Sequence, residues 1–387
     1  MPSQSGIFHE DYASDMQLRP TTMQRIRLAL VVIAVLAAPV VLGSNELRVV
    51  NQVLIAIVGA VGLNILTGFT GQISLGQGAF LAVGAYSTGL LMVPMAGAET
   101  IVFPTWLNWL EAPAQALAAW SAPWVIALIL GAFITAVIGG FFGLPSLRLK
   151  GLYLAVATLA AQVIVQWIII HWDPIDGELD GRTTDALNIP ATHLFGNEAW
   201  RLNDSETAFY WFALIITVLV VIATTNLFRT HIGRAFIAIR DQDIAAEVMG
   251  VNIFRYKVMA FALSSFIVGL AGGMLALHST AISFERFTIE VSIEYLAMII
   301  IGGLGSVSGS VYGAAFIVLL PEILRAAGRA IAGADPSRLQ EFNRILPFAQ
   351  QGVFGAVIVI TLIVESGGIK KLWQNAKDYF RLWPFSY

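Results

Sequence analysis

Long apolar runs constrain the fold of this chain more than any other feature. A helix of about 20 apolar residues crosses the hydrocarbon core of a bilayer. The sequence has ten candidate stretches, which lie near 26–43, 49–67, 78–95, 122–145, 151–172, 208–228, 257–278, 289–304, 308–325 and 351–365. Because these runs are continuous rather than alternating, they predict membrane helices and not the strands of a β-barrel.

The composition favours a membrane protein as well. Hydrophobic residues make up 57% of the chain and charged residues only 12%, whereas soluble domains carry about 25% charged residues. The net charge of −3 gives no indication of nucleic-acid binding. Cysteine is absent, which excludes disulfides and thiolate metal ligands. We expect no bound metal, because the histidines are scattered without ligand spacing: His9, His171, His193, His231 and His278.

The basic residues orient the predicted spans, since Lys and Arg are enriched in cytoplasmic loops. A ten-span count places four basic groups on the same side of the membrane. They lie before the first span, around Arg148 and Lys150, within 229–257, and after residue 366. The acidic loop 173–207 falls on the opposite, periplasmic side. We therefore expect a multi-pass protein of the bacterial inner membrane with both termini in the cytoplasm.

The predicted fold is an all-α, polytopic transmembrane helical bundle of about 8–10 spans, with Gly-rich broken or re-entrant segments. It comprises an N-terminal tail (1–25), a membrane domain (26–366) and a C-terminal tail (367–387). One predicted loop, 325–350, conflicts with the orientation because it falls outside yet carries four arginines. An alternative treats 289–325 as a re-entrant hairpin and leaves eight full spans.

A glycine-rich motif occurs twice. Residues 68–74 read GFTGQIS and residues 302–308 read GGLGSVS, and each copy lies between two apolar runs. The two copies are interpreted either as a parallel duplication, known in transporters, or as a chance likeness between two turns. Glycine allows close helix contact or a break in a helix. A break at membrane depth needs support from protein or a wet cavity.

The loop 229–257 is too polar for lipid and too regular for a linker. Phe236, Ile239, Ile244 and Val248 have the spacing of an apolar stripe on a helix, and Gly250 is expected to end that helix. The stripe would lie on the membrane surface or insert into a groove of a cytoplasmic partner.

At this loop the sequence resembles the permeases of ATP-binding-cassette importers. Their coupling loop often carries Glu-Ala-Ala, three residues and Gly, and Ala245, Ala246 and Gly250 fit this pattern while Ile244 replaces the Glu. The stretches GRAFIAIRDQDIAAEVMGVN (233–252), SIEYLAMIIIGGLGSVSGSVYGA (292–314), GFTGQISLGQGAFLAVGAY (68–86) and GLYLAVATLA (151–160) resemble the branched-chain amino acid permeases, closest to the LivM type. The wider family includes permeases for urea and short amides.

The resemblance implies a division of labour. A periplasmic binding protein delivers the solute, a related LivH-like permease completes the pathway, and two cytoplasmic ATPase subunits use ATP-Mg. This chain has no G-x-x-x-x-G-K-[ST] phosphate loop, so we expect no enzymatic activity and no cofactor of its own. The implied ATPase-coupling residues lie in segment 233–250: Gly233, Arg234, Arg240, Asp241, Ala245, Ala246 and Gly250.

Polar residues within apolar spans are candidates for the solute pathway, although such residues also join helices without touching solute. The candidates are Asn64, Thr67, Gln72, Ser74, Gln77, Thr158, Gln162, Ser264 and His278. An ion-coupled secondary transporter or a channel is the alternative function. Few ionisable residues lie in the spans, chiefly His278, Glu294 and Glu322, which disfavours ion coupling because such a carrier needs a buried titrating group.

The sequence departs from the family pattern at three places. Gln77 stands where many relatives have His or Tyr, residues 180–186 replace a usual Thr-Gly-Gly motif, and residues 365–368 replace a Pro-x-Gly. These departures widen the expected solutes from branched-chain amino acids to related small polar solutes, including urea and amides.

Overall fold

The computed structural model describes residues 22–92, 123–144, 151–171, 187–188, 205–279, 281–332, 336–364 and 367–382. The chain divides into two compact units, residues 1–48 and residues 49–387. In the first unit, α2 (Thr22–Val41) contains Pro39 and is followed by the start of α3 (Ser44–Asn64). The apolar part of α2 is Ala29–Val41, which is shorter than the predicted span 26–43 and than the about 20 residues of a full crossing.

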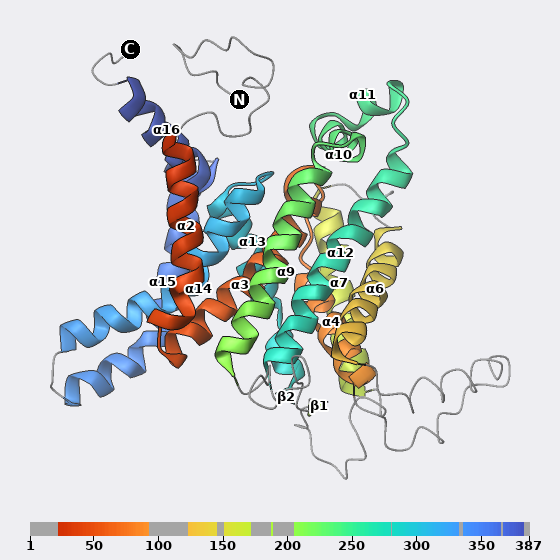
Figure 1. Cartoon of the computed structure of the whole chain (residues 1–387). Coiled ribbons are helices and arrows are strands. Elements are labelled where there is room, and N and C mark those ends of the chain that lie inside the picture. The colour runs from red at the N-terminus through yellow and green to blue at the C-terminus, as the bar shows by residue number, and fades with distance from the viewer. Residues whose placement is uncertain are drawn as a thin grey trace. The chain divides into compact units, whose positions relative to one another are not determined.

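The second unit is almost entirely helical in its described part (Figure 1). After α3 come the π-helix η1 (Ile65–Phe69), α4 (Gln77–Met92), α6 (Trp124–Gly143), α7 (Leu152–His171), α9 (Glu206–Leu227), α10 (His231–Asp241), α11 (Asp243–Val248), α12 (Ile253–His278), the 3₁₀ turn η7 (Phe284–Phe287), α13 (Ile289–Gly302), α14 (Val307–Ala332), α15 (Pro336–Val364) and α16 (Gly368–Leu382). The short strands β1 (Leu187–Asn188) and β2 (Ala281–Ile282) pair antiparallel, with Leu187 opposite Ile282.

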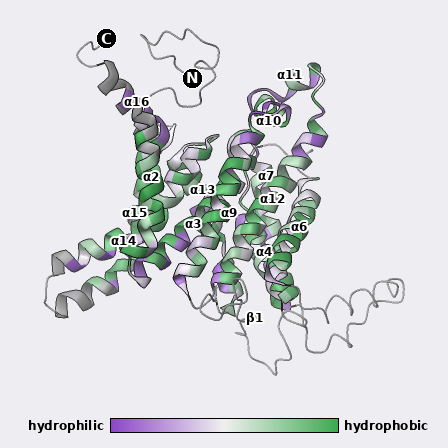
Figure 2. Ribbon diagram, viewed as in Figure 1, coloured by the Kyte–Doolittle hydropathy of each residue, from purple (hydrophilic) through white to green (hydrophobic). Residues whose placement is uncertain are grey.

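Seven described helices are long and apolar enough to cross a membrane. They are α6, α7, α9, α12, α14, the α3–η1 pair, and the Arg344–Thr361 part of α15. Large apolar side chains on their outer faces stay exposed, such as Phe133, Phe141 and Trp167 at 60%, 67% and 60%, and Figure 2 shows the apolar character of these helices. So much exposed apolar surface requires lipid or a partner chain. The chain is a multi-pass membrane protein.

Two further apolar helices are too short to cross alone over their described residues. α4 has 16 residues and α13 has 14, so at 1.5 Å per residue they extend about 24 and 21 Å, less than the about 30 Å of the hydrocarbon core. Both adjoin a glycine-rich motif, as predicted for broken segments. The re-entrant interpretation of 289–325 therefore fits α13, whereas α14 is long enough to cross.

The core of the second unit forms where α12 packs on α4 and α6. Small residues allow the backbones to approach, as is usual in membrane bundles. A Cβ atom on Gly269 of α12 would lie 2.7 Å from the Thr135 Cβ and 3.0 Å from the Ala132 Cα of α6. A Cβ on Gly84 of α4 would lie 2.6 Å from the Gly269 Cα. Glycine thus fixes the spacing of all three helices.

The predicted loop 325–350 is wrong. α14 continues to Ala332 and α15 begins at Pro336, so the arginines of this region lie mainly in helices. The reason is visible in the sequence, where Leu339, Phe342, Ile345 and Leu346 recur with helical spacing between the arginines. The arginines lower the mean hydropathy of the stretch, so a search for apolar runs did not detect this amphipathic helix.

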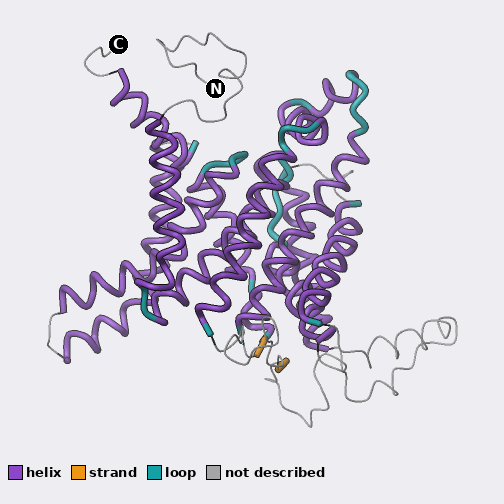
Figure 3. The backbone as a smooth tube through the Cα atoms, in the orientation of Figure 1, coloured by secondary structure: helices purple, strands orange, loops and turns teal. Residues whose placement is uncertain are grey.

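The predicted periplasmic loop 173–207 lies mostly outside the described residues. Within it, the structure describes β1 and residues 205–207. Figure 3 shows the β1–β2 pair beyond one end of α12, with α10 and α11 beyond the other end. The described parts of loops 229–257 and 173–207 therefore lie toward opposite ends of α12, and the predicted orientation in the membrane stays a prediction.

Candidate functional site

The two glycine motifs form turns that have a left-handed glycine at the same position. In the first, η1 ends at Phe69, Gly71 has φ +69°, and a segment without regular secondary structure leads to α4. In the second, α13 ends at Gly302, Gly305 has φ +70°, and α14 begins at Val307. Gly71 and Gly305 occupy equivalent positions in the two motifs. The shared left-handed conformation, which favours glycine, supports the duplication interpretation.

The two turns lie directly against each other. The amide of Gly305 donates to Asn64 Oδ1 (3.0 Å), and Asn64 Nδ2 donates to the Ser306 carbonyl (2.9 Å) and to Ser310 Oγ (2.6 Å). Asn64 is 1% exposed, so these bonds satisfy a polar group that would otherwise be costly to bury. A Cβ on Gly68 would collide with the Gly305 amide nitrogen. One asparagine therefore joins the two motifs across 241 residues of sequence.

Arg240 lies between the two turns. Its Nη1 donates to the Gly68 carbonyl (3.1 Å), while Nε and Nη2 contact Asp241 Oδ1 at 3.0 and 2.9 Å. A Cβ on Gly71 would lie 3.0 Å from Arg240 Cγ, and a Cβ on Gly305 would lie 2.7 Å from Arg240 Nη1. The arginine thus contacts the equivalent glycine of both motifs. We call Asn64, Gly68, Gly71, Arg240 and Gly305 the glycine-turn node.

Arg240 belongs to the predicted coupling segment 233–250. This segment consists of two helices, because Gln242 adopts an extended conformation (φ −159°, ψ 99°) between α10 and α11. Phe236 and Ile239 of the predicted apolar stripe are buried, whereas Ile244 and Val248 are 69% and 83% exposed, so the four residues do not form one continuous stripe. The break at Gln242 changes the register, so the second half of the stripe faces away from the bundle.

Some of the other predicted coupling residues are buried against the bundle, and others are exposed on the surface. Gly233 and Ala246 are buried, and a Cβ on Gly233 would lie 2.6 Å from the Leu227 carbonyl oxygen. Arg234 and Ala245 are exposed. Gly250 has φ +87°, and the Val251 amide donates to the Ala246 carbonyl (3.0 Å), which confirms that Gly250 ends the helix. α10 is thus attached to the bundle, whereas α11 presents an apolar surface.

A polar cavity of about 350 Å³ lies between the first turn and the α10–α11 junction. Gln72, Arg240, Asp241, Asp243 and Lys257 are among its lining residues. Gln72 is 4% exposed, and its side-chain amide has no hydrogen-bond partner among the described residues.

Comparison with known proteins assigns the chain to a family. Residues 45–362 match the family described as the branched-chain amino acid transport system permease component, which is most of the chain. The chain belongs to this permease family. It is 28% identical over 324 residues to the high-affinity branched-chain amino acid transport system permease protein LivM of Salmonella typhimurium, covering 79% of this chain and 69% of that protein. The LivM of Escherichia coli gives the same values.

More distant relatives transport other solutes. The L-arabinose transport system permease protein AraH of Escherichia coli is 27% identical over 160 residues, which cover 40% of this chain and 45% of AraH. No solved structure matches the chain. The protein is therefore a permease component of an ATP-binding-cassette importer and works together with other subunits.

The predicted pathway residues of this permease are buried, apart from the half-buried His278, and most of them join helices. Gln77 donates to the Gly59 carbonyl (3.0 Å) and Ser264 to the Gly62 carbonyl (2.7 Å). Thr67 donates to the Gln72 carbonyl (3.2 Å). Ser74 Oγ accepts from the Gly76 amide (3.3 Å). These bonds fit the interpretation of polar residues as helix contacts, and solute contact by these residues stays a prediction.

A second polar cluster joins α4, α7 and α13. Ser292 Oγ donates to Gln162 Oε1 (2.6 Å) and accepts from the Gly78 amide (2.8 Å), while Gln162 Nε2 donates to the Phe287 carbonyl (3.1 Å). On α7, Thr158 Oγ1 accepts from the Leu75 amide (2.9 Å). The adjacent cavity at Gln162 holds only about 10 Å³, about the size of one water molecule. This region of the described chain is closed to a solute.

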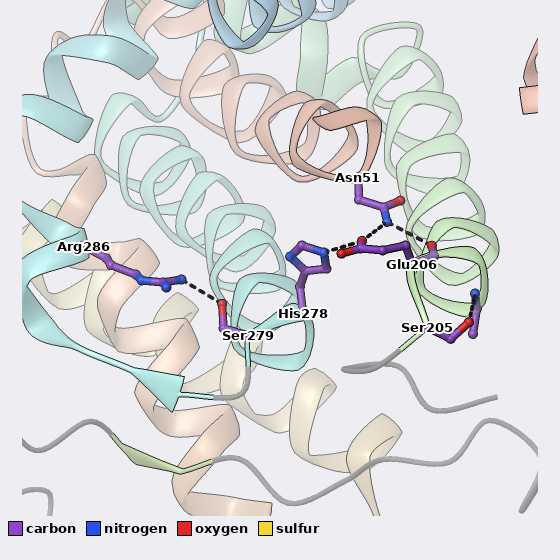
Figure 4. Close-up of polar contacts among 7 residues, drawn as sticks. Asn51, Ser205, Glu206, His278, Ser279 and Arg286 are labelled. Carbon is purple, nitrogen blue, oxygen red and sulfur yellow. Dashed lines mark hydrogen bonds and ion pairs between the residues drawn. The ribbon is translucent and has the colours of Figure 1, made fainter. Parts of the chain in front are cut away.

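His278 takes part in a third polar cluster, at the C-terminal end of α12 and away from the coupling segment (Figure 4). Its Nε2 lies 2.9 Å from Glu206 Oε2, and Asn51 Nδ2 donates to the same oxygen (2.9 Å) and to the Glu206 carbonyl (3.0 Å). The cluster therefore joins α3, α9 and α12. Sequence reasoning missed Asn51, Glu206 and Ser292, although each is a polar residue next to or within an apolar run, the signal by which the other candidates were found.

Proposed function

We propose that this permease forms half of a pathway through the bacterial inner membrane for branched-chain amino acids or related small polar solutes, including urea and amides. A periplasmic binding protein delivers the solute, and both termini of the permease lie in the cytoplasm. The names of the LivM relatives support the solute class. The match with a relative named for L-arabinose supports a family in which the same fold serves several small solutes.

The observation that carries the proposal is the connection between α10–α11 and the glycine turns. α11 exposes Ile244 and Val248, and Met249 directly after it is 84% exposed, while Arg240 contacts both turns. Two cytoplasmic ATPase subunits are the proposed source of movement, with α11 inserted in a groove of one of them. Closure of the ATPases around ATP-Mg would displace α11, and Arg240 would transmit this movement to the broken helix.

The second half of the pathway comes from a related LivH-like permease in this proposal. The α15 window Arg344–Thr361 is only 6% buried, and apolar faces of α6, α7 and α9 are exposed. These surfaces leave room for a partner chain as well as lipid. The small size of the Gln162 cavity also supports a pathway that this chain does not form alone.

The test is co-purification followed by uptake. The permease is expressed with its candidate partners, reconstituted in liposomes, and tested for uptake of labelled leucine in competition with other amino acids, urea, amides and aromatic acids. We expect uptake only with binding protein, ATP and both other subunit types. Transport by the isolated chain would instead support the secondary transporter or channel, and a lack of competition by the whole panel would refute the proposed solutes.

Two substitutions test the coupling segment. Ala246→Asp places a charge at a buried position of α11, and Gly250→Pro forces a negative φ where the native value is +87°. Both are expected to abolish uptake while the protein still inserts in the membrane. Normal uptake by both variants would contradict the assignment of 233–250.

A further inference from the structure

The C-terminal helix α16 has two chemically distinct faces. At 100° per residue, Ile369, Leu372 and Trp373 fall within one arc, and Lys370, Lys371, Gln374 and Lys377 fall outside it. Leu372 and Trp373 are 44% and 53% exposed. An apolar face of this kind is costly to leave in water.

The charge of α16 has one dominant sign. Its sequence contains Lys370, Lys371, Lys377 and Arg381 against the single acid Asp378. Lys377 Nζ lies 5.3 Å from the centre of the Trp373 ring, so a cation and an aromatic ring meet at the boundary between the two faces. Basic clusters next to a membrane span bind anionic lipid headgroups, and Trp is enriched at the membrane interface.

α16 begins on the side of the membrane where the glycine-turn node lies. A Cβ on Gly368 would lie 2.6 Å from both the Gly303 amide nitrogen and the Ile301 carbonyl oxygen, and a Cβ on Gly303 would lie 2.7 Å from the Gly367 carbonyl oxygen. The first residues of α16 therefore pack against the second glycine turn, which itself contacts Arg240. This fixes the helix at the level where a span ends and a headgroup region begins.

We propose that α16 lies on the membrane surface next to the coupling segment and binds anionic phospholipids. Its Leu372 and Trp373 enter the acyl boundary, and its lysines contact the lipid phosphates. Because Gly368 packs against the second turn, the lipid-bound helix restrains the same turn that Arg240 contacts at Gly305. Anionic phospholipids are proposed as the partner because their charge is opposite to that of the lysines on α16. This proposal does not depend on which solute is transported.

The test uses the absence of cysteine from this chain. Single cysteines are introduced as Leu372→Cys and Gln374→Cys, each is labelled with a nitroxide, and the complete transporter is placed in nanodiscs. Electron paramagnetic resonance then measures label accessibility to oxygen, which partitions into lipid, and to a water-soluble nickel chelate. In nanodiscs containing phosphatidylglycerol, we expect the label at 372 to favour oxygen and the label at 374 to favour nickel.

The lipid dependence separates a charged membrane surface from other partners. In pure phosphatidylcholine, or at high salt that screens the charges, the oxygen preference at 372 should fall. Replacing Lys370, Lys371 and Lys377 by Gln should lower the ratio of bound to unbound helix by about fivefold per lysine, with Gln374→Ala as the uncharged control. If the triple variant does not fold, the proposal is tested by the salt titration of the labelled protein that retains all three lysines.

Three results would overturn the proposal. They are equal nickel access at both positions, protection of residue 372 from both reagents because protein covers it, and an oxygen preference that is the same with and without phosphatidylglycerol. None of these results would affect the proposed import function, which the uptake assay tests separately.

Discussion

The two glycine turns each have a left-handed glycine at the same position, but different groups hold them in place. Before the first turn, the Asn64 side chain makes three hydrogen bonds to residues 305–310, in and directly after the second motif. The equivalent residue before the second turn is Met298, which is apolar and buried. That turn is closed instead by glycine backbones, since a Cβ on Gly309 would lie 2.7 Å from the Gly302 carbonyl oxygen. Asn64 therefore supplies side-chain hydrogen bonds that Met298 cannot supply at the equivalent position.

The largest expected effect comes from adding side-chain volume next to the second turn. Gly313→Val would place a Cβ against the Met298 carbonyl oxygen and 2.9 Å from the Gly302 amide nitrogen. Backbone atoms cannot move aside as a side chain would, so we expect a loss of about 3 kcal/mol or more, seen as a lower thermal midpoint in detergent. Gly352→Ala is the control, because nothing lies within 4 Å of its Cβ position. Equal midpoints for the two variants would contradict the backbone packing.

Removing Arg240 would separate both turns from the coupling segment. Arg240→Ala loses the charged hydrogen bond to the Gly68 carbonyl, worth about 1.5–3 kcal/mol. We expect binding-protein-dependent uptake to fall by about tenfold or more, while the partner ATPases still hydrolyse ATP. The exposed Arg255 of α12 provides the control Arg255→Ala. Retention of tight coupling between ATP hydrolysis and uptake in Arg240→Ala would show that the node does not transmit movement.

The role of Asn64 can be isolated by a double-mutant cycle. Asn64→Leu leaves the Gly305 amide without its acceptor, and we expect a destabilisation of about 2 kcal/mol. Ser310→Ala removes a second partner, so the two changes should be less than additive. At the equivalent position, Met298→Leu should cost less than about 1.5 kcal/mol. Additive losses would argue against a shared hydrogen-bond network, as measured by thermal unfolding of the purified permease.

The smallest effect compares two glycines of the same conformation. Gly71 and Gly250 have φ +69° and +87°, but a Cβ on Gly71 meets Arg240 Cγ at 3.0 Å while Gly250 is open. Gly250→Ala should cost about 1 kcal/mol of backbone strain, and Gly71→Ala somewhat more. In the Arg240→Ala background the excess at Gly71 should disappear. A persistent excess would show that strain, not contact with Arg240, distinguishes the two positions.

Sequence patterns predicted the elements well where the signal was local. Continuous apolar runs located the membrane helices, and Gly250 marked the end of α11, because span length and helix termination depend on neighbouring residues. The repeat of Gly71 as Gly305 was visible in the sequence, and both glycines have a positive φ in the structure. The amphipathic start of α15 was missed, since its arginines lowered the mean hydropathy of the stretch.

The contacts between distant segments could not be predicted in the same way. Asn64 was found as a polar residue in a span, but its partners lie more than 240 residues away. The extended conformation of Gln242 depends on how α10 and α11 are placed by the bundle, and this moved Ile244 and Val248 away from it. His278 was selected for its chemistry, whereas its partner Glu206 became visible only once α9 lay beside α12.

Close backbone contacts between glycines have a genetic consequence. Gly302 makes such contacts with Gly309 and Gly313, and Gly303 makes one with Gly368. Most single-base changes in a glycine codon that alter the residue add a Cβ, and at these positions a Cβ meets backbone. We therefore expect a saturation screen for growth on the imported solute to recover almost no substitutions here, while Gly352 and Gly355, which face open space, accept many. Such a contact can change in evolution only if helix spacing changes with it, so it should be among the slowest features of this chain to diverge.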